Sequence, residues 1–350
     1  MRNMVKYVLI IALLVVATAC GGRSQDGGSQ PVSGNEGGQE NQTAQQPEAK
    51  KPDYPAGGKE ITFIVPFSAG GGYDTLARAA VTILEQSLPN NPKIIVENVT
   101  TAAGRVGVEQ LYISEPDGYT IGNMSGGAVI PQIMEEVNYD LNQMEWIGIM
   151  STDYYITAAS KKSNIKSLDD ILARGEEVIV GMTGLSSIDG IGPHVMADKM
   201  GFQINAVGHK GSKEATISAV RGDVDLVSYP INAILPLVQN NELVPLWTSS
   251  PTRIPELPDV PTLSEMGYED VAKVFVLPRP LAAAPGTPKE IMDILRNAFQ
   301  KVLDNKDYQD LVIRVNQAEL GTNDPEKTKE VISNLFKLLT PYKDLLQSTK

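Results

Sequence analysis

The sequence has few residues that bind metals or form cross-links. Its only cysteine is Cys20, and its two histidines are His194 and His209. A single cysteine cannot form a disulfide within the chain, and it cannot build a thiolate cluster around a metal. Two histidines also argue against a histidine-rich zinc site. We therefore expect no metal site and no cofactor.

Positive charge is also scarce. The chain has 30 lysines and arginines against 42 aspartates and glutamates, a formal net charge of -12. This balance argues against nucleic acid as a partner. It also argues against a long-range electrostatic trap for anions. Any anion site must therefore be built locally, from backbone amides and hydroxyls.

The length and composition favour two lobes. The chain has 350 residues, of which 42% are hydrophobic and 21% are charged. That composition is typical of globular proteins. The chain is too long for one small core, and it contains no long run of like charge and no internal repeat.

The first twenty residues, MRNMVKYVLIIALLVVATAC, have the layout of a secretory signal. Arg2 and Lys6 precede the apolar segment Val8–Val16, which is too short to span a bilayer with ease, and small residues lead to Cys20. This start resembles a bacterial lipoprotein signal, in which residues 1–19 are removed and the cysteine is lipidated. An uncleaved anchor, or a plain signal with a chance cysteine, is the alternative. Acyl chains on the cysteine would hold the protein on a bacterial membrane, outside the cytoplasm.

A polar segment follows the signal. Residues 20–58 are rich in Gly, Ser, Gln, Asn, Glu and Pro, and their apolar content besides alanine is Val32 and Tyr54. Such a segment cannot bury enough surface to fold. We expect a disordered tether between the membrane and a folded body that begins at Lys59.

From Lys59 onward, short apolar runs alternate with amphipathic segments. The runs predicted to be strands are ITFIVPF, IIVEN, YTIGNMS, EWIGIM, YYITAAS, VIVGM, INAVG, DLVSY and LVPLWTS. Residues 73–87 are predicted to be a helix, and residues 287–347 to be mainly helical. We expect Thr287, Thr262 and Asp324 to cap helix starts. The alternation predicts an α/β fold with helices on the faces of parallel sheets.

In such sheets, ligands bind beyond the carboxyl ends of the strands, so the loops after the strands are the candidate sites. The first is PFSAGGGYD, Pro66–Asp74, with three glycines before a helix. Glycine allows positive φ, and a helix start offers free N–H groups to an anion. We expect a branched side chain at Gly71 to be penalised. The loop matches neither a P-loop nor G-x-G-x-x-G. The alternative is a glycine turn with Asp74 as a helix-end carboxylate.

Three further loops offer polar groups. The loop NMSGG contributes the hydroxyl of Ser125 and the adjoining Gly126, and the loop GHKGSKE contributes the cation of Lys210. The loop GMTGLSSIDG offers hydroxyls and a carboxylate: Thr183, Ser186, Ser187 and Asp189. Hydroxyls on glycine-hinged loops suit a carboxylate ligand. Each loop can also be an ordinary polar turn or helix cap.

Four segments resemble one family when they are taken in order. They are PFSAGGGYDTLAR, PDGYTIGNMSGG, VGHKGSKEATISAVRGDVD and RIPELPDVPTLSEMGY. They are similar to motifs of the receptors of tripartite tricarboxylate transporters, the Bug family. The resemblance runs from about Glu60 to near the C-terminus, with compatible spacing.

The resemblance implies a two-lobed periplasmic-binding-protein fold, type II-like, with a ligand cleft between the lobes. It implies a first lobe of residues 59–155 plus 279–350 and a second lobe of residues 156–278. It also implies a receptor that binds a small carboxylate and serves integral membrane transporter subunits, and we expect a monomer. The residues it places at the ligand are Phe67, Ser68, Ala69, Gly70, Gly71, Asp74, Ser125, Thr183, Gly184, Ser187, Lys210, Gly211, Ser212 and Tyr229.

Two departures from the family pattern concern the ligand. The family's second-lobe loop often ends in a histidine, where this sequence has Gly190, and His209 replaces the tyrosine that commonly precedes K-G-S. Both changes alter the cleft wall. The scarcity of cations near the four loops favours a ligand with one or two carboxylates, or an amino acid whose amine Asp74 or Asp189 pairs. Either aspartate can instead cap a helix.

Two other classes of function, a hydrolase and a sensing receptor, are alternatives to a receptor for transport. A hydrolase needs a nucleophile and a base, and the sequence has no G-x-S-x-G elbow. We therefore do not expect an enzyme. A ligand-sensing receptor that feeds a signalling partner has the same fold, since fold does not fix function. Neighbouring genes for membrane subunits or for a sensor kinase would separate the two receptor roles.

Overall fold

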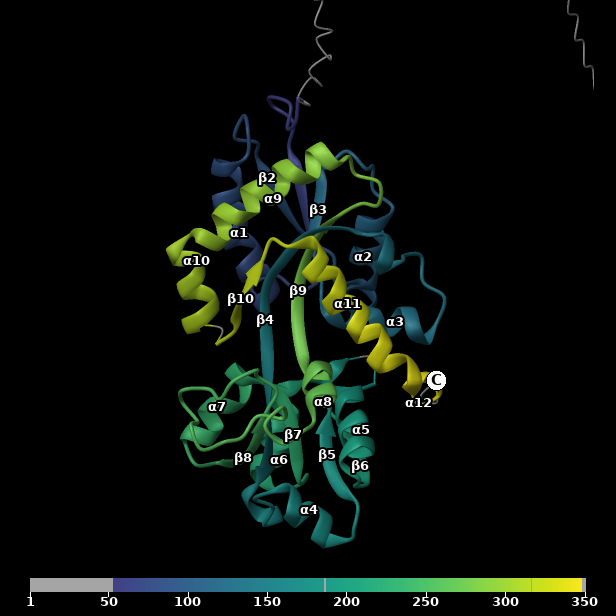
Figure 1. Cartoon of the computed structure of the whole chain (residues 1–350), viewed down its shortest axis with the longest axis vertical. Helices are drawn as coiled ribbons and strands as arrows, with labels where there is room; N and C mark the ends of the chain where they lie inside the picture. Colours follow the sequence, from purple (N-terminus) through teal and green to yellow (C-terminus); the bar gives the residue numbers. More distant parts are fainter. Residues whose placement is uncertain (1–52, 186, 316, 348–350) are drawn as a thin grey trace, which may run out of the picture. The chain divides into compact units, whose positions relative to one another are not determined.

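The computed structural model describes residues 53–185, 187–315 and 317–347 (Figure 1). The predicted signal peptide, the lipidation of Cys20 and most of the predicted tether lie outside the described residues, as does Ser186. No helix within the described ranges has both the length and the apolar character needed to cross a bilayer.

The strands fall into two groups, which we call sheet A and sheet B. Sheet A has the order β2-β1-β3-β9-β4, with β10 paired to β4. Its strands are β1 (Ile61–Val65), β2 (Ile94–Asn98), β3 (Thr120–Asn123), β4 (Glu145–Ser160), β9 (Val276–Ala283) and β10 (Glu319–Thr322). Strand β1 is parallel to β2 and β3, whereas β9 is antiparallel to β3 and β4.

Sheet B continues from the same β4 with the order β4-β7-β5-β6, and β8 also pairs with β4. Its other strands are β5 (Val178–Met182), β6 (Ile204–Gly208), β7 (Leu226–Pro230) and β8 (Leu243–Thr248). Strand β5 is parallel to β6 and β7, and β4 is antiparallel to β7 and β8. The mixed sheet with intervening helices confirms the predicted α/β class.

Strand β4 belongs to both sheets. Its residues 145–154 pair with β9 in sheet A, and its residues 155–160 pair with β7 and β8 in sheet B. We predicted two separate strands, EWIGIM and YYITAAS, and the structure has one strand of 16 residues. The polar residues between the two apolar runs lie at a shift in the register with β9, so the strand bends there without ending. Strand β10 was not predicted at all.

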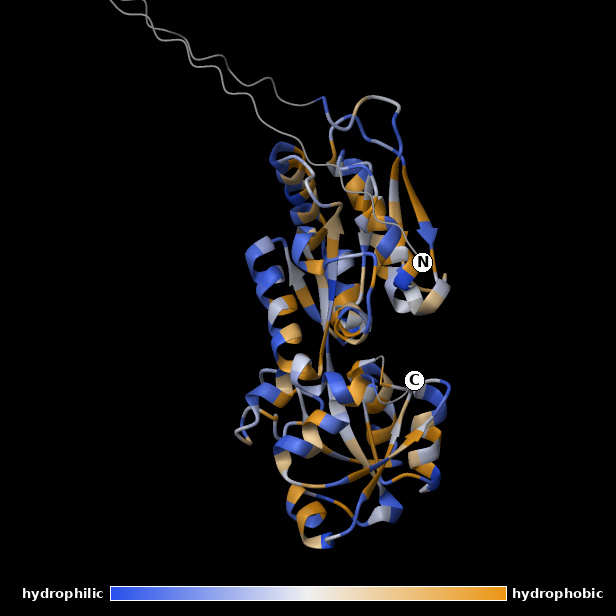
Figure 2. Ribbon diagram, turned by 90° about the vertical axis from the view of Figure 1, so that its right-hand side faces the viewer, coloured by the Kyte–Doolittle hydropathy of each residue, from blue (hydrophilic) through white to orange (hydrophobic). Residues whose placement is uncertain are grey.

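Helices cover the sheets, as Figure 1 shows. They are α1 (Gly72–Ser87), α2 (Arg105–Tyr112), α3 (Val129–Met134), α4 (Leu168–Arg174), α5 (Ile188–Met200), α6 (Ser212–Arg221), α7 (Ile231–Gln239), α8 (Glu269–Val274), α9 (Lys289–Asp304), α10 (Lys306–Asp310), α11 (Pro325–Leu339) and α12 (Lys343–Gln347). The sequence predicts one apolar face of α1 made by Leu76, Ala80, Ile83 and Leu84; the structure buries Leu76, Ala80 and Leu84, whereas Ile83 is half-buried. In Figure 2 the central strands are mainly apolar, whereas the helices carry both apolar and polar residues.

Of the three predicted helix caps, one is confirmed. Asp324 accepts the N–H groups of Glu326 and Lys327 at the start of α11. Thr287 does not cap α9, because its hydroxyl donates to the carbonyl of Ala284. Thr262 does form the predicted reciprocal pair of hydrogen bonds with Glu265, at 3.1 and 2.9 Å. Only a turn follows it, because Gly267 with a φ of 84° ends the turn before a helix can propagate.

The first described residues pack against sheet A. Tyr54 is buried, and its hydroxyl donates to the carbonyl of Gly118 at 2.6 Å. The Lys59 ammonium lies 3.4 Å from the centre of the Tyr119 ring and pairs with Asp117 at 3.1 Å. Tyr54 therefore joins the core before Lys59, where we expected the folded body to begin. These contacts lie at the amino ends of β1 and β3.

Candidate functional site

A cavity of about 530 Å³ lies where loops of sheet A meet loops of sheet B. Its volume is in the range of small-molecule sites. Residues that follow the strands of sheet A, together with Leu277 of β9, form one side. They are Pro66, Phe67, Tyr73, Ala102, Gly104, Arg105, Val108, Ser125, Gly127, Ala128, Pro131, Glu135 and Tyr139. Tyr155 of β4 and three residues after β5, Ser187, Ile188 and Asp189, form the other side.

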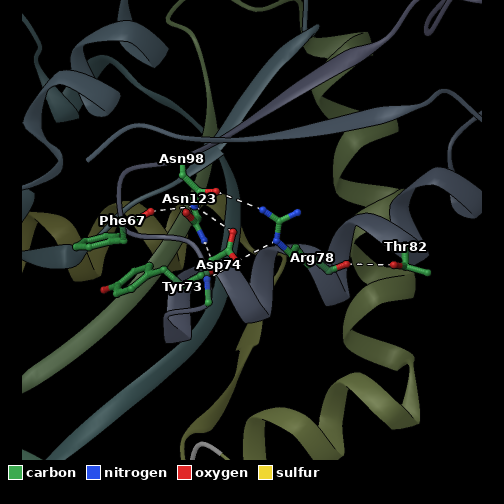
Figure 3. A network of polar contacts seen from close by, with 8 residues as sticks. Phe67, Tyr73, Asp74, Arg78, Thr82, Asn98 and Asn123 are labelled. Carbon is green, nitrogen blue, oxygen red and sulfur yellow. Dashed lines mark hydrogen bonds and ion pairs between the residues drawn. The ribbon is translucent and has the colours of Figure 1, made fainter. Parts of the chain in front are cut away.

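The loop between β1 and α1 is held by Asp74, which is 3% exposed. Its carboxylate accepts the N–H of Gly70 at 2.8 Å, the Nε–H of Arg78 at 2.9 Å and the amide of Asn98 at 3.0 Å. Figure 3 shows Asp74 between Arg78 and Asn98. The same Asn98 amide donates to the carbonyl of Phe67 at 2.9 Å. The Asp74 carboxylate is thus directed to its own loop and not into the cavity.

These contacts keep Asp74 ionised. The hydrogen bond from Arg78, which outweighs burial, lowers the pKa of Asp74 from 3.8 to about 2, and the bonds from Gly70 and Asn98 add to the effect. The positive φ that the glycines were expected to supply is at Gly70, with a φ of 77°. Gly71 is extended, with a φ of -78°, so the argument about positive φ applies to Gly70.

Helix α1 begins at the cavity. The N–H of Thr75 makes the first backbone bond of the helix, to the carbonyl of Gly71 at 2.9 Å. The N–H groups of Gly72 and Tyr73 precede that bond, so they have no acceptor within the helix. Tyr73 also lines the cavity. The positive end of the helix dipole therefore faces the space where a ligand fits.

A stack of three side chains supports this helix start. The rings of Phe67 and Tyr73 are stacked with centroids 4.0 Å apart, and the Arg279 guanidinium lies 4.8 Å from the Tyr73 ring centre. Arg279, on β9, forms an ion pair with Asp153, on β4, and both side chains are at least 94% buried. Arg279 Nη1 also donates to Ser151 at 3.4 Å. Burial raises the pKa of Asp153, while Arg279 acts in the opposite direction.

The loop between β5 and α5 resembles the loop before α1, because an aspartate in the first turn of the helix again accepts a hydrogen bond from a loop N–H. Asp189, in the first turn of α5, accepts the N–H of Thr183 at 3.2 Å and also its hydroxyl. Ser187 lies 3.1 Å from the Thr183 hydroxyl and donates to the carbonyl of Gly184 at 2.8 Å. Unlike Asp74, Asp189 is half-buried and lines the cavity.

Two buried tyrosines flank Asp189. Burial, and next the charge of Asp189, raise the pKa of Tyr155 and of Tyr229 above the ordinary value. Both phenols therefore stay neutral and can donate hydrogen bonds. The Tyr229 hydroxyl is buried and interacts with the Asp189 carboxylate as a hydrogen-bond donor.

Among the described residues that line the cavity, the charged groups are one arginine and two carboxylates. Arg105 pairs with Glu135 at 2.9 Å and with Glu109 at 3.6 Å. Glu135 and Asp189 are the acids of the lining. The Tyr139 hydroxyl donates to the carbonyl of Ala128 at 2.9 Å. In the part of the chain that the structure describes, no group of three or more His, Cys, Asp or Glu is arranged to hold a metal.

The structure brings together part of the predicted site. Phe67, Ser125, Ser187 and Asp189 line the cavity. Other predicted residues lie in the same loops, or behind them, without lining it: Ser68, Ala69, Gly70, Gly71, Asp74, Gly126, Thr183, Gly184 and Tyr229. Lys210 and Gly211 lie on the loop between β6 and α6, and Ser212 begins α6; none of the three lines the cavity, and Lys210 is exposed. The role of each in binding stays a prediction.

Sequence reasoning missed Tyr73, Arg105, Glu135, Tyr139 and Tyr155. Two of them had a usable signal. Tyr73 is next to Asp74 in the glycine loop, and Arg105 begins the helix after the strand IIVEN. Tyr155 lies inside a predicted strand, and no sequence pattern distinguishes it from a core residue.

Known proteins resemble this chain over most of its length. The family described as "Tripartite tricarboxylate transporter family receptor" matches residues 76–337. The protein BugT of Bordetella pertussis is 29% identical over 267 residues, which are 72% of this chain and 78% of BugT.

Solved structures show the same fold. A TctC solute binding protein from Polaromonas, solved without ligand, has a TM-score of 0.73 at 22% identity and covers 83% of this chain and 99% of its own. MatC from Rhodopseudomonas palustris, with bound malate, has a TM-score of 0.63 at 19% identity and covers 84% of this chain and 100% of its own. The predicted periplasmic-binding-protein fold is confirmed.

Proposed function

Because the chain belongs to the tripartite tricarboxylate transporter receptor family, we propose that it captures a small carboxylate outside the cytoplasm and delivers it to integral membrane transporter subunits. The observation that carries the proposal is the cavity of about 530 Å³, which loops of both sheets line. A ligand there touches both halves of the molecule, so its binding favours a closed arrangement of the two sheets.

The start of α1 is the proposed carboxylate position. The N–H groups of Gly72 and Tyr73, which have no acceptor within the helix, the dipole of α1 and the Ser125 hydroxyl supply donors without a net positive charge. The sole arginine of the described lining is paired with acids. A ligand with three carboxylates would bring charge that this cavity does not neutralise. We therefore propose a ligand with one or two carboxylates, a size class that includes the malate in MatC.

The division into lobes is part of the proposal. Residues 59–155 with 279–350 form the first lobe, and residues 156–278 form the second. Strands β4 and β9 are hydrogen-bonded neighbours that connect them. We also propose that Cys20 carries the lipid anchor and that the receptor is a monomer. Mass spectrometry of membrane-extracted protein tests the anchor, which an unmodified N-terminus at another residue would contradict.

Native mass spectrometry and thermal-shift measurements test the function. We expect a small acid to co-purify, or one or more mono- and dicarboxylates to raise the melting temperature. Citrate alone as a stabiliser would contradict the proposed ligand class while leaving the receptor intact. If no carboxylate or amino acid binds by either method, the proposed function is wrong.

A further inference from the structure

A buried arginine lies next to the start of α1. Arg279 is 5% exposed and is not among the residues that line the cavity. Its guanidinium lies 4.8 Å from the centre of the Tyr73 ring, and its Nη2 atom lies 3.7 Å from the position that a Cβ atom on Gly72 would occupy. Gly72 and Tyr73 carry the N–H groups proposed to hold the ligand carboxylate. The positive charge of Arg279 therefore lies beside those two donors, although Arg279 does not reach the cavity.

Two hydroxyl groups connect Arg279 to the cavity. The buried Tyr73 hydroxyl interacts with the Arg279 guanidinium and with the Ser125 hydroxyl as a hydrogen-bonding group. Burial raises the pKa of Tyr73, and Arg279 and Ser125 reduce that rise, so the phenol stays neutral. Ser125 lines the cavity, and its Oγ accepts the N–H of Gly127 at 3.1 Å. Since a hydroxyl has two lone pairs, Ser125 can accept from both Gly127 and Tyr73 and donate its own proton to a ligand.

The ion pair of Arg279 with Asp153 has a direction. The two side chains pair through Nη2 of the arginine, and both are at least 94% buried. Burial has the largest effect on the pKa of Tyr73, and the charge of Arg279 affects it more than the charge of Asp153 does. The cation is therefore the member of the pair that acts more strongly on the start of α1. An ion pair is neutral as a whole, but a group nearer its cation experiences a positive potential, which salt screens little in a buried place.

We propose that Arg279 is a positioning residue for the ligand carboxylate, which strengthens the donors of α1 and of Ser125 without touching the ligand. This rests on the proposed receptor function and adds to that site a residue outside the lining. Hydrogen-bonded groups polarise one another, so a guanidinium next to Tyr73 makes the Ser125 hydroxyl a better donor to an anion. The cavity can thus attract a carboxylate although the chain has a net charge of -12 and Arg105 is already paired with acids.

Stability and ligand affinity, measured separately, test the proposal. The double variant Arg279→Met with Asp153→Leu removes both charges and is expected to unfold in urea much like the wild type. Calorimetry uses the tightest wild-type ligand among L-malate, adipate, 4-methylpentanoate, L-glutamate and L-leucine. We expect the double variant to bind it at least about tenfold more weakly, as the loss of a charged group allows. Unchanged affinity would overturn the proposal and leave the receptor function intact, whereas a wild type that binds none of the five would overturn both.

Asp153→Asn is expected to change the affinity in the opposite direction. It removes the negative charge and leaves the charge of Arg279 uncompensated. We expect a less stable protein that binds the same ligand at least about threefold more tightly, because the potential at the start of α1 becomes more positive. An ion pair with a structural role alone predicts weaker or unchanged binding, and either result would overturn the proposal.

Tyr73→Phe tests the connection through the hydroxyls. It keeps the stacked ring and removes the hydroxyl between Arg279 and Ser125. We expect the affinity to fall about threefold or more in the wild-type background and to change less in the double variant, where the charge is already gone. Tyr308→Phe is the matched control, because Tyr308 is a buried phenol that also interacts with the charge of Arg279, but its hydroxyl donates to the carbonyl of Met150 at 3.2 Å and it does not line the cavity. Equal losses of affinity in the two tyrosine variants would overturn the role of the Tyr73 hydroxyl.

Discussion

In each of the two loops that face each other across the cavity, an aspartate accepts a hydrogen bond from an N–H of its own loop, but the two aspartates differ in their surroundings. In the loop after β1, Asp74 turns back to the N–H of Gly70, and in the loop after β5, Asp189 turns back to the N–H of Thr183. Asp74 has three donors on three separate residues and is 3% exposed. Asp189 accepts two hydrogen bonds from Thr183, interacts with the Tyr229 hydroxyl and lines the cavity.

The difference separates structural support from recognition. A carboxylate surrounded by donors fixes a loop and has no capacity left for a ligand. A half-buried carboxylate that lines the cavity keeps part of that capacity and contributes less to stability. The first loop is therefore expected to be the more rigid wall of the cavity, and the second to be the wall that selects.

The largest effect is expected from Arg279→Met. Arg279 lies against the Tyr73 ring at the start of α1, and its removal leaves Asp153 buried without a cation. We expect the free energy of unfolding to fall by about 3 kcal/mol or more, measured with urea. The control is Arg279→Met with Asp153→Leu, which removes both charges and should recover most of the loss. A double variant no more stable than the single one would show that the charge pair does not explain the effect.

A smaller loss is expected from Asp74→Asn. The depressed pKa of Asp74, from 3.8 to about 2, corresponds to about 2 kcal/mol of stability at neutral pH. Because the folded-state pKa is the lower one, this contribution is complete above about pH 4 and is lost as the pH falls through about 2. Urea unfolding of wild type and variant should thus differ at neutral pH and converge in acid. Asp189→Asn is expected to lose less than about 1 kcal/mol. If Asp74→Asn and Asp189→Asn lowered the free energy of unfolding equally, the two aspartates would not differ in their contribution to stability.

Gly70→Ala is expected to lower the free energy of unfolding by about 1 kcal/mol. Gly70 has a φ of 77°, where an alanine is strained although no atom lies within 4 Å of the new methyl group. Gly211→Ala is the matched control, because its surroundings are equally open and its φ of 177° is extended backbone. If both substitutions change the melting temperature alike, backbone conformation is not what distinguishes the first loop.

The smallest effect is expected from Lys210→Ala. Lys210 is exposed, and it is its backbone N–H, not its side chain, that bonds Glu214. Ligand affinity by calorimetry should change less than about twofold, as for other exposed charges. The neighbouring exposed Lys213→Ala serves as a reference. A tenfold loss of ligand affinity in Lys210→Ala but not in Lys213→Ala would show that the loop after β6 closes on the ligand and takes part in its selection.

The sequence allowed the prediction of features that depend on local patterns. Apolar runs such as ITFIVPF and VIVGM predicted strands correctly, and Asp324 with the following proline predicted a helix start. Features that depend on contacts between distant segments could not be predicted from the sequence. The continuity of β4 depends on pairing with β9, which is more than a hundred residues away, and Arg279 has no sequence signal beyond a charge within an apolar run.

The candidate site shows the same limit. Residue types and loop positions predicted Phe67, Ser125, Ser187 and Asp189 at the ligand, and these line the cavity. No local pattern reveals that Asp189 lines the cavity and Asp74 does not, because the donors that hold Asp74, Asn98 and Arg78, come from another strand and from the next helical turn. The two aspartates look alike in the sequence and differ in their neighbours.

Tyr54 and Lys59 join sheet A at the amino ends of β1 and β3, whereas Phe67 and Ser125 follow the carboxyl ends of those strands. The five residues of β1 alone separate the two ends by about 16 Å. A bead, electrode or fluorescent protein coupled at Lys59 is therefore attached at the end of the sheet remote from the cavity mouth. The fold is accordingly suited to immobilisation through its N-terminal side in a ligand biosensor, with the mouth left open to the sample.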